Sequence, residues 1–193
     1  MAARTLKQVL TIAGSDSGGG AGIQADLKSM SANGVFAMSV ITAVTAQNTE
    51  DVTDVFELPT SIIASQLDAV FDDFEVSAVK TGMLSSTAIV ELVAKMLAIQ
   101  KVTNLVVDPV MISKSGRALL KPDAIDALKK LLFPLALIVT PNIHEAQQLS
   151  GIAISNLADA RRAAKIIHGF GSQYVLIKGG HLLTERATDL LYD

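Results

Sequence analysis

Short apolar runs alternate with amphipathic helical patterns along most of this chain. The apolar runs, rich in β-branched residues, predict strands at 9–12, 35–44, 76–79, 105–107, 137–139 and 174–177. Between them, spacing of three to four residues predicts helices at 21–32, 61–74, 86–98, 123–132, 142–150 and 157–169. This alternation predicts an α/β fold with a mostly parallel sheet and helices on both faces. Because most of the apolar runs are continuous, we expect their strands to be buried on both faces.

Two shorter patterns complete this picture. Residues 53–58 predict a strand near an edge of the sheet, and residues 189–192 predict another at the end of the chain. The chain contains no internal repeat, low-complexity tract or linker pattern. At 193 residues it is long enough for one sizeable core, so we expect a single domain spanning 1–193.

Composition excludes several classes of protein. Half of the residues are hydrophobic and 18% are charged, which argues against disorder, and the net charge of -3 gives no indication of general nucleic-acid binding. The absence of cysteine excludes disulfides and thiolate metal sites. No signal-peptide pattern is visible, and no apolar run approaches the roughly 18 residues that a membrane span needs. We therefore expect a soluble, cytoplasmic protein.

A turn crowded with glycine and serine, at 13–22, joins the first predicted strand to the first predicted helix. Such a turn can leave backbone N–H groups free to face an anion or polar ligand, although it can also be a flexible surface loop. It is not a P-loop, because Gly22 is followed by Ile23 and Gln24 rather than by Lys and Ser or Thr. A loose dinucleotide-binding match at Gly20, Gly22 and Ala25 begins inside the turn and is weak.

Polar or glycine-rich clusters follow the predicted strands one after another. Because ligands bind at the carboxyl ends of parallel strands, we expect these clusters to line one rim of the sheet. They are 13–22, Thr45-Ala46-Gln47-Asn48-Thr49, Lys80-Thr81-Gly82-Met83, Asp108-Pro109-Val110-Met111, Thr140-Pro141-Asn142 and Lys178-Gly179-Gly180-His181.

Taken together and in order, these clusters resemble the hydroxymethylpyrimidine/phosphomethylpyrimidine kinases of thiamine biosynthesis, members of the ribokinase-like superfamily. The resemblance also includes Gln24-Ala25-Asp26 and Glu145-Ala146, and it covers essentially the whole chain. It implies a three-layer α/β/α sandwich. It also implies ATP-dependent phosphorylation of 4-amino-5-hydroxymethyl-2-methylpyrimidine and then of its monophosphate, with Mg²⁺ as the metal.

One departure from the family concerns the C-terminal part of the fold. Members of the family carry a Gly-Thr-Gly-Cys-like anion-hole segment farther along the chain, which supplies the residue that activates the substrate hydroxyl. No such segment occurs before Asp193. We therefore expect a truncated chain that is incompletely recorded or inactive, with the general base beyond Asp193. A non-catalytic pyrimidine-binding protein remains an alternative, and a downstream fused domain stays open.

The resemblance implies that the pyrimidine is bound by Gly14, Asp16, Gly22, Gln47, Met83 and Val110. The Gln47 carboxamide can pair with an exocyclic amine and a ring nitrogen, and the Met83 thioether can pack on the ring. Other roles are open: Gln47 could cap a loop, Met83 could fill the core, and Asp16 could bond its own turn. Pyridoxal or pyridoxine kinase of the same superfamily is the second interpretation, and Gln47 argues against it.

For the nucleotide, the resemblance implies Asp108 and Glu145 as magnesium ligands, partly through water. It implies Asn142 as a nucleotide contact and Lys178 as a catalytic contact with phosphate. The alternatives are an Asx-type turn for Asp108, a carboxylate favoured by the helix dipole for Glu145, and a solvated surface side chain for Lys178.

Three further side chains are weaker candidates. Lys114 and Arg117 could contact phosphate, whereas His181 fits a local structural role better than that of a base. Apolar residues around Val35–Met38 and an incomplete sheet edge, together with the resemblance, predict a homodimer.

Overall fold

The computed structural model of this chain describes residues 6–112, 119–180 and 188–193. Within these residues, seven strands form one sheet in the order β2-β1-β5-β6-β7-β8-β9. All neighbours pair in parallel except β9, which is antiparallel to β8. The strands are β1 (Gln8–Ala13), β2 (Phe36–Ile41), β5 (Val76–Thr81), β6 (Leu105–Val107), β7 (Ile138–Val139), β8 (Tyr174–Ile177) and β9 (Leu190–Tyr192). The predicted parallel sheet is confirmed.

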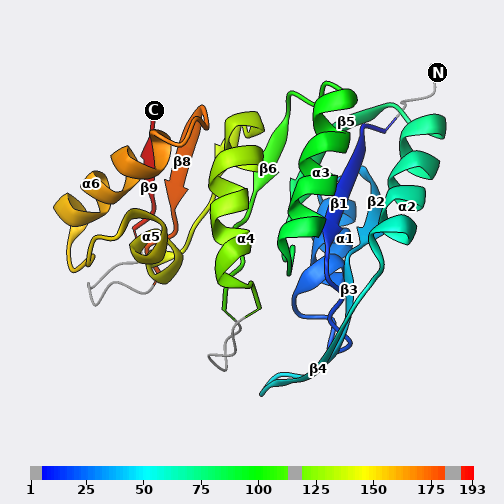
Figure 1. Cartoon of the computed structure of the whole chain (residues 1–193), viewed down its shortest axis with the longest axis horizontal. Coiled ribbons are helices and arrows are strands. Elements are labelled where there is room, and N and C mark those ends of the chain that lie inside the picture. The colour runs from blue at the N-terminus through cyan, green and yellow to red at the C-terminus, as the bar shows by residue number, and fades with distance from the viewer. Residues whose placement is uncertain (1–5, 113–118, 181–187) are drawn as a thin grey trace.

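Helices cover the two faces of this sheet unequally. Figure 1 shows α2, α3, α4 and α6 in front of the sheet and α1 behind it. The helices are α1 (Gly22–Ala32), α2 (Thr60–Asp73), α3 (Thr87–Ile99), α4 (Pro122–Ala127), α5 (Ile143–Ser150) and α6 (Leu157–His168). A π-helical turn, Leu128–Leu132, and a 3-10 turn, Phe133–Leu135, extend α4. The segment predicted as one helix at 123–132 therefore changes its winding partway. None of the helices in the described ranges has the length and apolar character that crossing a bilayer requires.

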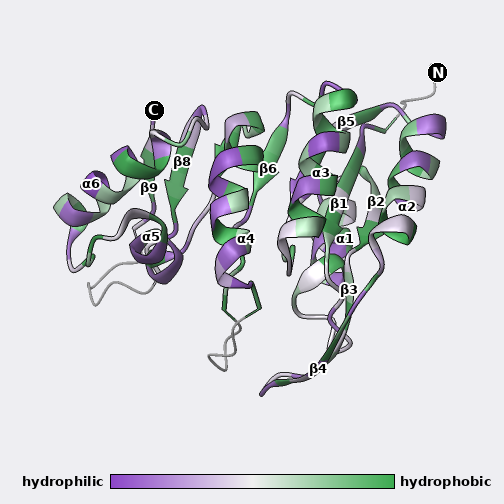
Figure 2. Ribbon diagram, viewed as in Figure 1, coloured by the Kyte–Doolittle hydropathy of each residue, from purple (hydrophilic) through white to green (hydrophobic). Residues whose placement is uncertain are grey.

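The main core lies between the sheet and its front helices. Figure 2 shows apolar residues along the strands, whereas the helices carry both polar and apolar positions. Fully buried side chains from both layers meet there: Leu10, Ile12, Val40, Leu105, Val139 and Val175 from the strands, and Ile63, Leu67, Val90, Val93 and Ile167 from the helices. Burial of this kind is the main favourable contribution to folding.

The prediction that the strands are buried on both faces is wrong for β6, β7 and β8. Their residues alternate between buried and half-buried positions, as Val175 and Ile177 do with Tyr174 and Leu176. The physical reason is the position of α1, which packs on β1 and β2 and not on these strands. A continuously apolar run therefore does not reveal how many of its faces are covered.

The predicted strand at 35–44 is two strands that belong to different sheets. The chain leaves the main sheet at Thr42, where the Thr42 N–H donates to the Ala13 carbonyl and the hydroxyl donates to the Met83 carbonyl. Just before this point, the Gln66 side chain bonds both the N–H and the carbonyl of Ile41 and so replaces a neighbouring strand. The continuation, β3 (Ala43–Gln47), pairs antiparallel with β4 (Val52–Glu57) in a two-stranded ribbon. The strand expected near an edge of the main sheet thus belongs to this ribbon, which projects beyond the strand ends in Figure 1.

Candidate functional site

A pocket of about 450 Å³ opens at the carboxyl ends of the main strands, beneath the β3–β4 ribbon. The pocket lies at the end of β1, which pairs with β2 on one side and with β5 on the other. The order of strands along the sheet therefore reverses at this point. Such reversals of strand order are the usual ligand sites of open α/β sheets. All ten residues predicted for the site line this pocket: Gly14, Asp16, Gly22, Gln47, Met83, Asp108, Val110, Asn142, Glu145 and Lys178.

The glycine-rich turn is organised by the carboxylate of Asp16, which is 3% exposed. The backbone N–H groups of Gly18, Gly20 and Ala21 donate to it at 2.8, 2.9 and 2.7 Å. The N–H of Asp16 itself donates to Oε1 of Gln24 at 2.7 Å. Most of the donors that the sequence suggested for an anion are therefore used within the turn. This is the turn-forming role that we considered as the alternative for Asp16, and its direct contact with substrate stays a prediction.

Glycines allow this turn to lie close against its neighbours. Gly22 has a φ of 54°, in the left-handed region, and a Cβ there would come within 2.5 Å of the Gly14 carbonyl oxygen. A Cβ on Gly14 would collide with the terminal methyl of Met83. Gly22 is thus required by its backbone conformation and by packing, whereas a side chain at Gly14 would displace only the flexible end of Met83, which lies against the turn.

The turn is also hydrogen-bonded to β3, which ends in Gln47. The Ser17 hydroxyl donates to the Gln47 carbonyl at 2.6 Å and accepts from the Gln47 N–H at 2.8 Å. Two residues earlier, the Thr45 N–H donates to the Ser15 hydroxyl at 3.0 Å, and the Thr45 hydroxyl donates to the Ser15 carbonyl at 2.9 Å. The Gln47 side chain accepts one long bond, 3.4 Å, from the Thr45 hydroxyl. These contacts hold the Gln47 backbone firmly while its carboxamide remains in the lining of the pocket.

Met83 and Val110 supply apolar surface on the neighbouring part of the pocket. Met83 follows β5 and is 8% exposed, so it fills space beside the turn and also lines the pocket. Val110 follows β6 and is half-buried. A flat, mostly apolar ring matches such walls, with polar contacts confined to a few positions.

Asp108 and Lys178 form an ion pair on the other side of the pocket. Lys178 Nζ lies 2.7 Å from Asp108 Oδ1, and the Thr140 hydroxyl donates to the same oxygen at 3.2 Å. The side chains of Lys178 and Asp108 are 41% and 24% exposed. Lys178 is therefore a paired side chain of the pocket lining rather than a free surface lysine. Within the described ranges, Asp108 makes no Asx-type bond.

Glu145 lies at the start of α5, where it forms a capping box with Asn142. Its carboxylate accepts from the Asn142 N–H at 2.8 Å, and its own N–H donates to the Asn142 side chain at 2.9 Å. Burial raises the pKa of Glu145 above its ordinary value of 4.5, and repulsion from Asp108 adds to this, while the Asn142 bond and Lys178 oppose it. Two carboxylates that repel one another in a partly buried pocket are a suitable environment for a divalent cation.

Asp108 and Glu145 therefore fit a metal ion that is completed by water and phosphate oxygens. Among the residues that the structure describes, no group of three or more acidic, histidine or cysteine side chains is placed to hold a metal. That the contacts with the metal are made partly through water stays a prediction. Magnesium is commonly bound in this way, by one or two carboxylates together with substrate phosphates.

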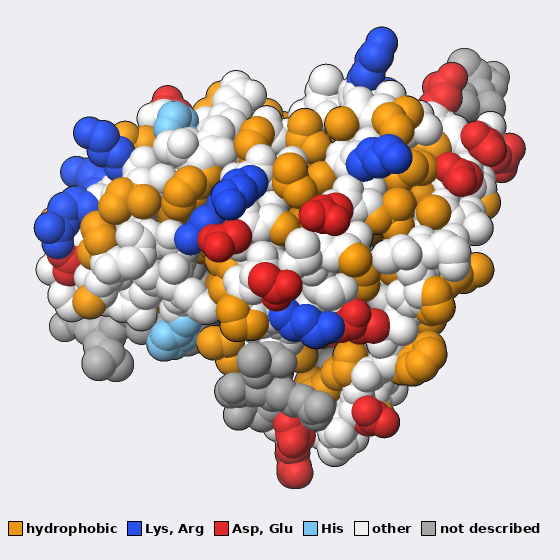
Figure 3. All heavy atoms as spheres, viewed as in Figure 1, with side chains coloured by type: hydrophobic (Ala, Val, Ile, Leu, Met, Phe, Trp, Pro, Cys, Tyr) orange, Lys and Arg blue, Asp and Glu red, His pale blue; other side chains and the backbone are white. Residues whose placement is uncertain are grey.

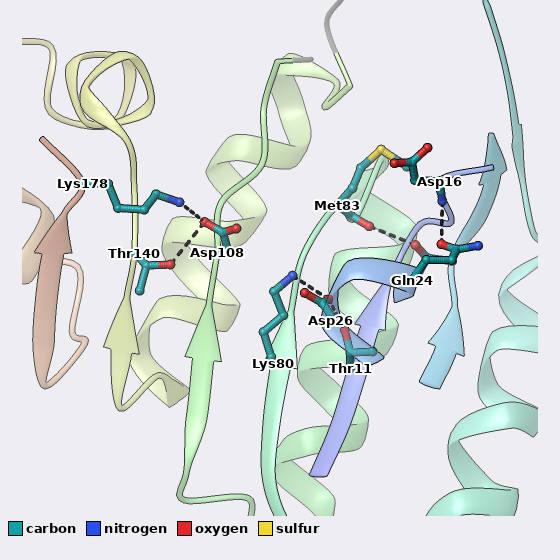
Figure 4. Close-up of polar contacts among 10 residues, drawn as sticks. Thr11, Asp16, Gln24, Asp26, Lys80, Met83, Asp108, Thr140 and Lys178 are labelled. Atoms are coloured by element: carbon teal, nitrogen blue, oxygen red, sulfur yellow. Dashed lines mark hydrogen bonds and ion pairs between the residues drawn. The ribbon is translucent and has the colours of Figure 1, made fainter. Parts of the chain in front are cut away.

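Sequence reasoning missed a second ion pair in the pocket, between Lys80 on β5 and Asp26 on α1. Lys80 Nζ lies 2.8 Å from Asp26 Oδ2, which also accepts from the Thr11 hydroxyl at 2.6 Å. Figure 4 shows this group between the Lys178–Asp108 pair and Asp16. A signal was present, because Lys80 directly follows the apolar run at 76–79 and is the first residue of one of the predicted rim clusters. The weaker candidates Lys114, Arg117 and His181 lie outside the described residues.

Comparison with known proteins identifies a family. A family model described as phosphomethylpyrimidine kinase matches residues 16–193. The chain belongs to the phosphomethylpyrimidine kinase family. A hydroxymethylpyrimidine/phosphomethylpyrimidine kinase of Haemophilus influenzae is 52% identical over 94% of this chain and 68% of its own length. A thiamine biosynthesis bifunctional protein of Geobacter sulfurreducens is 50% identical over 96% of this chain and 38% of its own length.

Solved structures show the same fold. Phosphomethylpyrimidine kinase from Clostridium difficile, with a TM-score of 0.89 and 53% identity, is matched over 96% of this chain and 80% of that one. Pyridoxal kinase from Bacillus subtilis, solved as an ADP complex, has a TM-score of 0.89 and 44% identity over 98% of this chain and 72% of that one. The family and the ribokinase-like α/β fold predicted from the sequence are confirmed. Membership of a kinase family also implies the use of ATP.

Proposed function

We propose that this phosphomethylpyrimidine kinase family member phosphorylates 4-amino-5-hydroxymethyl-2-methylpyrimidine with ATP and then phosphorylates the resulting monophosphate. One observation carries the proposal: a single pocket holds two chemically different sides. Gly14, Gln47 and Met83 form a side suited to a flat aminopyrimidine. Asp108, Glu145 and Lys178, with Asn142, form a side suited to a metal-bound polyphosphate.

In the first step, the oxygen of the hydroxymethyl group forms a bond to the γ-phosphorus of ATP as the bond to the ADP oxygen breaks. The hydroxyl proton leaves to a base, which we assign to none of the described residues. In the second step, an oxygen of the monophosphate forms a bond to the γ-phosphorus of another ATP as the bond to the ADP oxygen breaks, which gives the diphosphate and ADP. Such transfers depend mainly on positioning and on stabilisation of charge. Lys178 would contact the transferred phosphate, and Mg²⁺ held by Asp108 and Glu145 would neutralise charge on the nucleotide phosphates.

Pyridoxal phosphorylation is the second candidate, supported by the likeness to the Bacillus subtilis pyridoxal kinase. The side chain of Gln47 separates the two, because a carboxamide can donate to and accept from an aminopyrimidine at once. Calorimetric titration of the chain with the hydroxymethylpyrimidine and with pyridoxal tests the choice. We expect tighter binding of the pyrimidine, with that preference reduced by Gln47→Ala. Tighter binding of pyridoxal that Gln47→Ala does not affect would support the second candidate instead.

We also propose that the protein is a cytoplasmic homodimer. The apolar segment first suggested for the interface fits only in part, because Met38 is 7% exposed and Phe36 stacks on Phe74 with ring centroids 5.9 Å apart. The ribbon offers a better surface, since Val44 and Phe56 face one another across β3 and β4 and are 48% and 66% exposed. Sedimentation analysis of Phe56→Glu tests this: a wild-type dimer that becomes a monomer is expected, and a monomeric wild type would contradict it.

A further inference from the structure

The Lys80–Asp26 pair lies in the ligand pocket, where it joins α1 to β5. Both side chains line the pocket together with Gly14, Gln47 and Met83. They are only 20% and 18% exposed, so the pair has lost much of its hydration. In such positions an ion pair adds little net stability to a fold, because the cost of desolvation offsets the attraction. A contact with ligand therefore explains a lysine at this position better than a contribution to stability does.

The ammonium group of Lys80 has unused hydrogen-bonding capacity. Of its three N–H donors, one is directed to Asp26 Oδ2 at 2.8 Å, and the structure gives it no other partner among the described residues. The Thr11 hydroxyl holds the same carboxylate oxygen at 2.6 Å. Asp26 therefore holds the lysine in place, while two of its donors remain for a ligand.

A glycine keeps the space beside this ammonium open. A Cβ on Gly82 would come within 2.9 Å of Lys80 Nζ and 3.0 Å of the Ala13 Cβ. Gly82 directly precedes Met83, which we assign to the pyrimidine ring. The access to Lys80 thus lies next to the proposed ring position and not next to the nucleotide side of the pocket.

The other lysine in the described part of the pocket lining is placed for the nucleotide. Lys178 follows β8 and pairs with Asp108 after β6, whereas Lys80 lies on β5 next to β1. Lys178 reaches from the end of β8 to Asp108 after β6, whereas Lys80 pairs with Asp26 of α1, so the two ammonium groups are held by different carboxylates. Figure 4 shows the two pairs as separate groups. Two cations at two places match two different phosphate groups.

We infer that Lys80 binds the phosphoryl group of the monophosphate substrate, which makes the pocket suitable for the second transfer as well as the first. The inference rests on the proposed function and deepens it, because the two steps differ by one phosphate on the same hydroxymethyl oxygen. When the uncharged alcohol is bound, Lys80 and Asp26 neutralise one another. When the monophosphate is bound, the free N–H donors of Lys80 contact its oxygens and offset its added charge.

Calorimetric titration of the same chain with the hydroxymethylpyrimidine and with its monophosphate tests this subsite. For Lys80→Met we expect the affinity for the monophosphate to fall about 10- to 100-fold, the range for loss of hydrogen bonds to a charged group. The affinity for the uncharged alcohol should stay unchanged. Lys95→Met is the matched control, since Lys95 is exposed on α3, outside the pocket, and carries the same charge. It should change neither affinity.

Two further variants keep the test decisive if the lone carboxylate of Asp26 disturbs folding in Lys80→Met. The double variant Lys80→Met with Asp26→Asn removes both charges, and it should bind the alcohol but lose affinity for the monophosphate. Lys80→Arg retains the charge and should recover part of the monophosphate affinity. Melting temperatures by circular dichroism report whether each variant is folded.

The outcomes separate this inference from the proposed function. An equal loss of affinity for both ligands, or no loss for either, in a folded Lys80 variant overturns the phosphate subsite and leaves the pyrimidine site standing. A wild-type chain that binds neither pyrimidine overturns the proposed function and the subsite with it.

Discussion

Replacing Asp16 tests whether one carboxylate holds the glycine-rich turn in its binding shape. In Asp16→Asn, the remaining carbonyl oxygen can accept from Gly20 and Ala21, but the new NH₂ group then faces the N–H of Gly18. The variant loses one charge-assisted bond of 2.8 Å and gains an opposition between two donors. Hydrogen bonds to charged groups contribute about 1.5–3 kcal/mol each, so we expect the free energy of unfolding to fall by about that amount. Asp16→Ala leaves all three donors to water and should cost more, about 3–5 kcal/mol.

Urea unfolding followed by circular dichroism measures these differences. Asp68→Asn on α2 is a suitable control, because Asp68 is exposed and a surface change of this kind should stay within about 0.5 kcal/mol. Pyrimidine affinity should fall in Asp16→Asn as well, since the turn carries Gly14 and Gly22. An Asp16→Asn variant as stable as the control would refute the reasoning, because the three short bonds could then not be what organises the turn.

Three other predictions concern the two sides of the pocket. Gln47→Ala should weaken binding of the hydroxymethylpyrimidine by about 1–3 kcal/mol, the cost of unpaired polar groups on the buried ligand, and unchanged affinity in calorimetry would count against this site. Asp108→Asn should weaken binding of Mg²⁺-ADP while leaving pyrimidine affinity nearly intact; the reverse pattern would place Asp108 in the wrong half of the pocket. Because the pKa of Glu145 is raised in the folded protein, the wild type should lose stability relative to Glu145→Gln as pH rises from 4.5 through the folded pKa. Denaturant unfolding of both proteins across this range checks the sign, and a difference that does not change with pH would contradict it.

The sequence by itself determined the order of strands and helices and the composition of the rim. The apolar runs ending in polar clusters were sufficient for this, because the carboxyl ends of parallel strands lie at one edge of a sheet. The ten predicted site residues therefore line one pocket, although they are spread from Gly14 to Lys178. The family could also be identified from these clusters, since their order along the chain is specific.

Only the tertiary structure decided which partner each polar group finds. Nothing near Thr42 in the sequence shows that the strand ends there. The group that bonds the backbone of Ile41 in place of another strand is the side chain of Gln66, which is 25 residues farther along the chain. Likewise, Lys80 and Asp26 are separated by 54 residues and meet because α1 packs on β1, the strand that pairs with β5.

The coverage of each strand face and the distribution of surface charge also depend on packing. The apolar runs predicted strands buried on both faces. In the described residues, however, one face of β6, β7 and β8 is only half-buried. On the face drawn in Figure 3, several lysine and arginine side chains gather over α6, and others lie scattered over the rest of the face. The net charge of -3 could not show that distribution. Periodicity along the chain reports which residues favour burial, whereas the partners that cover, pair or neutralise them come from segments far away in sequence, whose positions are set by the packing of the whole fold.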